Sequence, residues 1–161
     1  MIYVNARAFI ERYNNGEIEI VIQTRNKPGE DKGFELPGGQ VNEYESLIEA
    51  VKREVLEETG LKVSFVHGEE SIVTTKDITK DFVMECIKPL AVYQTIKGPV
   101  DSMGVYFICN AEGNLTATGD FTLNATWINI NELHSLVNNN KHLFCEIDLA
   151  GIMFYLKEKL L

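Results

Sequence analysis

Cysteine is scarce in this sequence: only three occur among 161 residues, far apart at Cys86, Cys109 and Cys145. A zinc site or a disulfide framework would need cysteines in close pairs, so neither is expected. The three thiols are predicted to be small buried groups in a protein of a reducing compartment.

Long hydrophobic runs are also missing. No segment approaches the ~18 consecutive apolar residues that cross a bilayer. The start of the chain, MIYVNARAFIERY, has no basic segment followed by a long apolar stretch. The sequence therefore predicts a cytoplasmic protein with no membrane partner.

Positive charge is in short supply. There are 15 Lys and Arg against 24 Asp and Glu, which gives a formal net charge of −9. Such a surface repels DNA, RNA and anionic lipid unless a bound cation reverses the local field. We therefore expect no nucleic-acid partner, and the excess of acidic residues is compatible with a bound metal ion.

Apolar residues are plentiful, at 45% of the chain, and this is enough for a core within one domain spanning residues 1–161.

Asn15-Gly16 between two alternating runs predicts a hairpin, and Pro37-Gly38-Gly39 is expected to end any regular element. Further strands are predicted at residues 62–66, 71–75, 90–96, 103–109 and 125–130, and helices at 46–59, 131–137 and 148–161.

Strands and helices in this mixed order predict an α/β fold with a mixed β-sheet flanked by helices on both faces. The apolar face of the C-terminal helix is expected to pack on its own sheet. Pairing of that face with a second chain, as a homodimer, stays open.

The helix at residues 46–59 has well-marked ends. Ser46 followed by Glu49 is typical of a capping box at the first turn. Gly60 stands where a left-handed residue commonly ends a helix. The sequence therefore delimits this helix sharply.

Three glutamates of this helix lie in an unusual place. On a helical wheel Glu54, Glu57 and Glu58 fall at the edge of the apolar stripe, whereas a solvated acidic face would lie opposite it. Neighbouring carboxylates repel one another, and a hard divalent cation such as Mg²⁺ would relieve that repulsion. The alternative is a charged surface helix in which Lys52 and Arg53 neutralise the glutamates.

The spacing of the charged residues favours the metal site. From Gly39 to Leu61 the chain follows the pattern G-x5-E-x7-R-E-U-x-E-E-x-G-U, in which U is a bulky aliphatic residue. All nine defined positions match the signature of the Nudix hydrolases, so the chain resembles this family and its MutT-like members. The stretches ELPGG and TWINI extend the resemblance over most of the chain.

The resemblance implies a Nudix-type α/β/α sandwich that hydrolyses a diphosphate linked to another moiety with Mg²⁺ or Mn²⁺. It makes Glu57 and Glu58 metal ligands, and Glu54 either a ligand or the base that activates water. Gly39 would offer a backbone carbonyl to the metal, and Arg53 would orient the glutamates. Glu45 and Gly60 would be structural residues of the signature.

Some members of the family use one more acid outside the signature. Asp120, seven residues before Trp127, is the favoured candidate here, ahead of Glu112, Glu85 and Asp101. Each of these is more often an ordinary surface acid.

The substrate is expected to be a small nucleotide-type diphosphate. Residues 74–76 lack the proline typical of many ADP-ribose hydrolases, and Asp77 and Ile78 stand where many diadenosine polyphosphate hydrolases carry a tyrosine. Elimination leaves nucleoside triphosphates. Four aromatic residues could stack on a base, although aromatics at strand positions are more often core: Phe34, Tyr93, Tyr106 and Phe107.

Two other functions stay open. One is a nucleotide sensor that has kept the fold and lost the chemistry, although the complete set of glutamates argues against it. The other is a hydrolase of a non-nucleotide diphosphate. That substrate calls for a basic pocket, and few Lys or Arg residues cluster outside residues 25–32.

Overall fold

The computed structural model describes residues 1–116, 118–119 and 121–161. Its first two strands, β1 (Tyr3–Asn14) and β2 (Glu17–Arg25), form the predicted hairpin. Both turn residues take positive φ angles, 52° at Asn15 and 80° at Gly16, as such a turn requires.

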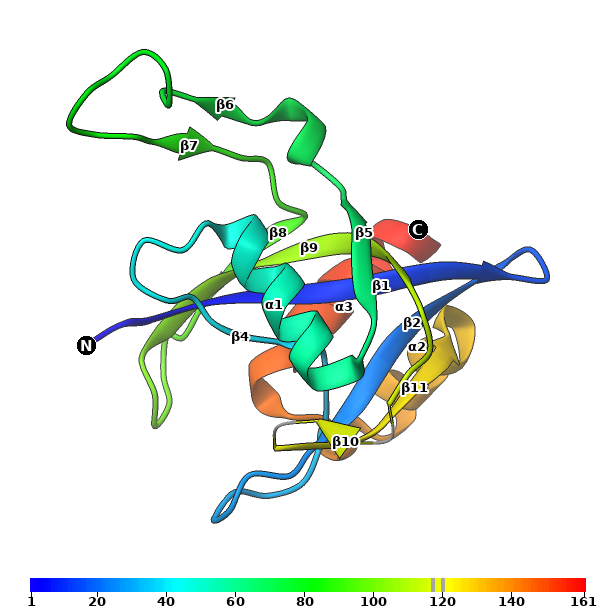
Figure 1. Ribbon diagram of the computed structural model, residues 1–161. Coiled ribbons are helices and arrows are strands. Elements are labelled where there is room, and N and C mark those ends of the chain that lie inside the picture. Colours follow the sequence, from blue (N-terminus) through cyan, green and yellow to red (C-terminus); the bar gives the residue numbers. More distant parts are fainter. Residues whose placement is uncertain (117, 120) are drawn as a thin grey trace.

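These strands lie at the centre of one mixed sheet (Figure 1). The order along the sheet is β10-β11-β2-β1-β9-β5, and β3, β4 and β8 add to β2, β1 and β9 respectively. The β1–β9 pair is parallel and the other pairs are antiparallel. Besides β1 and β2, the strands of this sheet are β3 (Phe34–Glu35), β4 (Gly38–Gln40), β5 (Lys62–Val66), β8 (Ala91–Gln94), β9 (Ser102–Glu112), β10 (Thr118–Gly119) and β11 (Thr122–Asn129).

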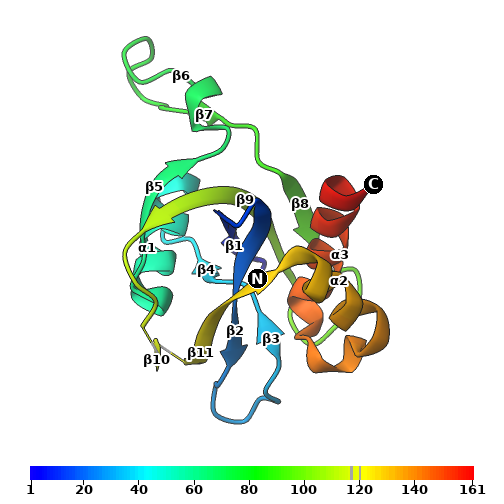
Figure 2. The same ribbon diagram turned by 90° about the vertical axis from the view of Figure 1, so that its right-hand side faces the viewer.

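Helices cover both faces of the sheet, as predicted. Figure 2 shows α1 (Leu47–Thr59) on one side and α2 (Ile130–Asn139) with α3 (Glu146–Leu160) on the other. Two short 3₁₀ turns, η1 (Glu69–Ser71) and η2 (Lys141–Leu143), complete the helical segments.

Side chains alternate along β1, so this one strand contributes to two separate cores. Ala6 and Ala8 join the core that includes Val55 of α1. Phe9 points the other way, where its ring stacks on Tyr155 of α3 with centroids 4.2 Å apart. The prediction that the C-terminal helix packs on its own sheet is confirmed.

The strand predicted at residues 71–75 is shorter than expected. Only β6 (Val73–Thr74) is extended, and it pairs with β7 (Glu85–Cys86) in a small second sheet. This hairpin projects from the body of the molecule in Figure 1, and its strand residues are exposed. Ile72 packs at the edge of the first core, but Val73 is exposed, so the apolar pattern overstated the strand.

The expected break at Pro37-Gly38-Gly39 is confirmed at Pro37, which lies between β3 and β4, but it is wrong for the two glycines. Gly38 and Gly39 belong to β4 and pair with Arg7 and Ala6 of β1. A Cβ atom at Gly38 would lie 2.5 Å from the Ala6 carbonyl oxygen, so only glycine allows this close pairing.

Two further expectations concern single residues and membranes. Cys109 is buried as predicted, but Cys86 is exposed on the projecting hairpin and Cys145 is half-buried. Within the described residues no helix has the length and apolar composition needed to cross a membrane. The cytoplasmic location stays a prediction.

Candidate active site

The helix that carries the glutamates, α1, has the predicted ends. The Ser46 hydroxyl accepts a hydrogen bond from the Glu49 backbone N–H at 3.1 Å. Gly60 ends the helix with φ 75°, and its N–H donates to the Leu56 carbonyl. These caps fix the position of the last two turns, on which Arg53 to Glu58 stand.

Arg53 is the centre of a cluster of carboxylates, which we call the Arg53 cluster: Arg53, Glu45, Glu54 and Glu57. Its guanidinium donates to both Glu45 oxygens at 2.7 and 2.8 Å, and to Glu54 Oε1 at 2.6 Å. A longer contact of 3.5 Å reaches Glu57 Oε2. One planar cation thus holds three carboxylates of the signature in fixed relative positions.

Charge in the Arg53 cluster is strongly stabilised. Hydrogen bonds from Arg53 and from the Asn42 N–H lower the pKa of Glu45 to about 2. The same bonds to Glu45, together with those to Glu54, raise the pKa of Arg53 above its ordinary value. Glu45 and Arg53 therefore remain ionised throughout the neutral pH range.

Gly39 lies directly against one carboxylate of this cluster. A Cβ atom at Gly39 would come within 2.6 Å of the Glu54 carboxylate carbon. No larger residue fits there without displacing Glu54. The β4 backbone at Gly39 and the Glu54 carboxylate therefore pack closely, with no room for a side chain at position 39.

Glu58 points away from the other glutamates, into the protein. It is 9% exposed, and its Oε2 accepts from Gln23 Nε2 at 2.7 Å and from the Gly38 N–H at 3.0 Å. Burial raises the pKa of Glu58 to about 8, although these two hydrogen bonds oppose the shift. Glu57, by contrast, is exposed.

A buried polar network continues inward from Glu58 and was not predicted. Gln23 also donates to Glu35, whose carboxylate lies 3.7 Å from Arg7, and Arg7 pairs with Asp148 at 2.7 Å. Burial alone would lower the pKa of Arg7, but the carboxylates of Asp148 and Glu35 raise it. One signal was available in the sequence: Arg7 interrupts the apolar run ARAFI.

The donor set suits a hard cation, because the glutamates and the Gly39 carbonyl supply only oxygen. In the described part of the chain, however, no three or more His, Cys, Asp or Glu side chains are arranged so that, as they stand, they could hold a metal ion. The reason is visible in their partners: Glu54 is held by Arg53, and Glu58 by Gln23 and Gly38. These hydrogen bonds engage one oxygen of each carboxylate, Oε1 of Glu54 and Oε2 of Glu58.

The other candidate residues lie outside this arrangement. Asp120 falls outside the described residues, and Glu85, Asp101 and Glu112 are exposed. Glu85 lines a cleft of about 440 Å³ between the projecting hairpin and the segment just before α1, which includes Glu45.

The four aromatic residues divide into two groups. Tyr106 and Phe107 are fully buried in the two cores, which confirms the core interpretation for them. Phe34 and Tyr93 are half-buried, so the interpretation holds for them only in part.

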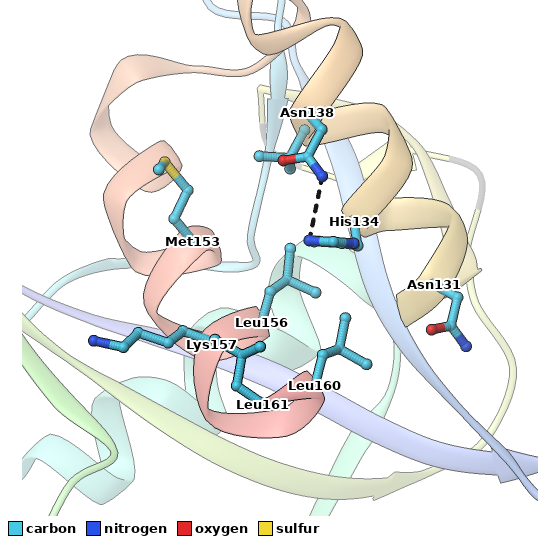
Figure 3. A pocket seen from close by; sticks show the side chains of 9 residues that line it. Asn131, His134, Asn138, Met153, Leu156, Lys157, Leu160 and Leu161 are labelled. Atoms are coloured by element: carbon cyan, nitrogen blue, oxygen red, sulfur yellow. Dashed lines mark hydrogen bonds between the residues drawn. The ribbon is translucent and has the colours of Figure 1, made fainter.

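A second hollow of about 410 Å³ lies between α2 and α3, on the opposite side of the sheet from α1 (Figure 3). Its walls are mainly apolar, and its one internal hydrogen bond joins Asn138 to His134 within α2 at 3.2 Å. None of the signature residues lines it.

Comparison with known proteins shows the family. The model of the NUDIX domain matches residues 3–147. The chain belongs to the Nudix family. This match includes every residue of the Arg53 cluster and the buried partners Gln23 and Glu35.

Two curated relatives match part of the chain. One, YtkD of Bacillus subtilis (strain 168), is provisionally named an 8-oxo-dGTP diphosphatase and is 38% identical over 79 residues, 44% of this chain and 49% of that protein. The other, the 8-oxo-dGTP diphosphatase of Buchnera aphidicola subsp. Acyrthosiphon pisum (strain APS), is 40% identical over 55 residues, 32% of this chain and 44% of that protein. The chain thus spans about half the length of the curated relatives that it matches.

Solved structures share the fold at lower identity. The Nudix domain of Shewanella oneidensis NrtR, solved with ADP ribose, superposes with a TM-score of 0.67 at 15% identity, covering 100% of this chain and 90% of that one. A structure of MutT, from work on the Aliivibrio salmonicida and Vibrio cholerae proteins, superposes with a TM-score of 0.63 at 18% identity. The match covers 98% of this chain and 99% of that one. These likenesses show the fold.

Proposed function

We propose that this protein is a metal-dependent hydrolase that cleaves a diphosphate linkage in a nucleoside di- or triphosphate derivative, with nucleoside triphosphates as its main substrate class. The Arg53 cluster carries the proposal. One guanidinium contacts Glu45, Glu54 and Glu57, and Glu54 lies against the Gly39 backbone, in a chain with a complete Nudix signature. The names of the two curated relatives support 8-oxo-dGTP as the first substrate to test.

The residues proposed to hold Mg²⁺ or Mn²⁺ are Glu54, Glu57, Glu58 and the Gly39 carbonyl. When bound, such an ion polarises phosphate oxygens and lowers the pKa of a coordinated water. Arg53 holds the Glu54 carboxylate in place, where Glu54 serves as a further ligand or as the base that accepts the proton of the attacking water.

Two residues of the signature support these groups without meeting the substrate. Glu45 binds Arg53 through both of its oxygens and so fixes the guanidinium plane. Gly60 ends α1 in the left-handed conformation, which sets where the last turn, with Glu57 and Glu58, stands. Both act by positioning.

A nucleotide sensor without catalysis is the second candidate, and one observation favours it. Glu54 and Glu58 each accept a hydrogen bond from another side chain, so both carboxylates are held in place by protein groups without an ion. A non-nucleotide diphosphate is less well supported. In the basic segment at residues 25–32, Glu30 pairs with Arg25 and lies 3.7 Å from Lys27, which reduces the positive charge available to an anion.

The test is product release from a panel of 8-oxo-dGTP, dGTP, ADP-ribose, a dinucleoside polyphosphate and an isoprenoid diphosphate, with Mg²⁺, with Mn²⁺ and with EDTA. We expect metal-dependent cleavage of a nucleoside triphosphate to its monophosphate and pyrophosphate. Glu57→Gln should lower turnover about 100-fold because it removes a metal ligand.

Glu49→Gln is the matched control, because it makes the same chemical change on an exposed position of α1 outside the Arg53 cluster. It should keep wild-type turnover. Binding of nucleotides without cleavage of any panel member would favour the sensor. Wild-type turnover in Glu57→Gln would contradict the assigned site.

A further inference from the structure

Both backbone polar groups of Leu36, next to the proposed site, are held by buried charged side chains. Arg7 Nη2 donates to the Leu36 carbonyl at 2.7 Å, and the Leu36 N–H donates to Asp148 Oδ2 at 2.9 Å. Arg7 Nη2 also donates to that same Asp148 oxygen at 2.7 Å. Arg7 is 4% exposed, and Leu36 and Asp148 are fully buried.

Leu36 leads directly into the segment that contacts α1. Pro37 follows, and its carbonyl accepts from the Ala8 N–H at 2.9 Å. Gly38 then donates its N–H to Glu58, and Gly39 lies against the Glu54 carboxylate. Only Pro37 therefore separates Leu36 from the Gly38-Gly39 backbone, which contacts two of the proposed metal ligands.

A purely structural link between α3 and β1 does not need these charges. A buried ion pair is often no more stabilising than well-packed apolar residues of similar volume. A second α3–β1 link exists, in which the Tyr155 hydroxyl donates to Glu11 at 2.5 Å. Only the Arg7–Asp148 pair also binds the Leu36 backbone, and an apolar pair could not do so.

We infer that Arg7 and Asp148 are positioning residues for the reaction proposed above: they fix the backbone of Leu36 through its N–H and its carbonyl, and through it the register of Gly38 and Gly39 against Glu58 and Glu54. The inference rests on the proposed function for its effect on turnover. Its structural part, that the pair holds the Gly38-Gly39 backbone in place, is independent of any activity.

The test is the double variant Arg7→Met with Asp148→Leu, which removes both charges together and keeps the volume filled. Glu35 retains Arg25 at 3.2 Å in this variant. We expect a folded protein in which amide hydrogen exchange at Gly38 is about tenfold faster. We also expect kcat to fall roughly 10- to 100-fold with little change in KM, because the ligands are displaced and not removed.

The matched control is Glu11→Gln with Tyr155→Phe, which breaks the other buried link between the same two elements and does not touch Leu36. It should leave kcat and exchange at Gly38 unchanged. If the first double variant does not fold, Asp148→Asn takes its place. It keeps the shape of the side chain and weakens the hydrogen bond from the Leu36 N–H.

The outcomes separate the two proposals. Wild-type exchange at Gly38 in a folded Arg7–Asp148 variant overturns the inference, whatever its turnover. Faster exchange with unchanged kcat also overturns the positioning role. If the wild-type protein cleaves no panel member while the variant exchanges faster at Gly38, the proposed function fails and the backbone-holding role stands.

Discussion

Two groups of charged residues meet at the end of α1, and they differ in how the chain assembles them. The Arg53 cluster lies within one stretch of sequence and is partly exposed; the Arg53 side chain is 28% exposed. The buried network of Arg7, Glu35 and Asp148 comes from β1, β3 and α3, and these side chains are 0–4% exposed.

This difference predicts different consequences of mutation. In an exposed cluster water replaces a lost partner, so an ion pair contributes little to stability. In a buried network the remaining charge has no solvent, so loss of one partner is severe. The Arg53 cluster is therefore expected mainly to orient side chains, whereas the buried network both orients the backbone and stabilises the fold.

The largest effect is expected from Asp148→Ala. It leaves Arg7 buried with only Glu35, at 3.7 Å, as an anionic partner. The free energy of unfolding should fall by about 3–5 kcal/mol, as measured by urea unfolding at pH 7. A loss below about 1 kcal/mol would put this pair in the same class as surface ion pairs and remove the contrast.

A smaller effect, of opposite sign, is expected at Glu58 in the metal-free protein. Its pKa is raised by burial from 4.5 to about 8, so the folded chain keeps a proton that the unfolded chain has lost. The contribution of Glu58 to stability is therefore greatest below pH 4.5 and falls as the pH rises from 4.5 to 8. Glu58→Gln cannot ionise and should stabilise the metal-free protein at pH 8 by on the order of 2–4 kcal/mol.

Urea unfolding at pH 5 and pH 8 in EDTA checks this expectation. The variant should lose the decrease in stability between the two pH values. Glu57→Gln, at an exposed position on the same helix turn, serves as the control and should keep the wild-type pH dependence. An identical pH dependence in Glu58→Gln would show that Glu58 is not the group responsible.

The smallest effect on stability is expected from Arg53→Ala. Its partner Glu57 is 46% exposed, while Glu45 and Glu54 are 13% and 14% exposed, so the free energy of unfolding should fall by about 1–2 kcal/mol, less than for Asp148→Ala. Turnover should nevertheless fall roughly 10- to 100-fold, because the glutamates lose their orientation. A destabilisation equal to that of Asp148→Ala, or a change in KM alone, would contradict the assignment.

Much of the local structure was predictable because its causes are local. Ser46 and Gly60 delimit α1 through backbone hydrogen bonds within a few residues of each. The contact of Arg53 with Glu57, four residues on, follows from helical spacing. The β6 segment was overestimated because its apolar residues find no core, and an apolar pattern cannot reveal that.

The sequence by itself determined the family, the mixed sheet between helices and the position of the glutamates on one helix, because periodicity and spacing act over short distances. Only the tertiary structure decided that Asp148 would meet Arg7, 141 residues away, across the backbone of Leu36. It also decided that Glu58 would turn inward to Gln23 while Glu57 stayed in solvent. Both outcomes depend on which faces of β1, β2 and α3 the folded sheet brings together, and no local pattern encodes that.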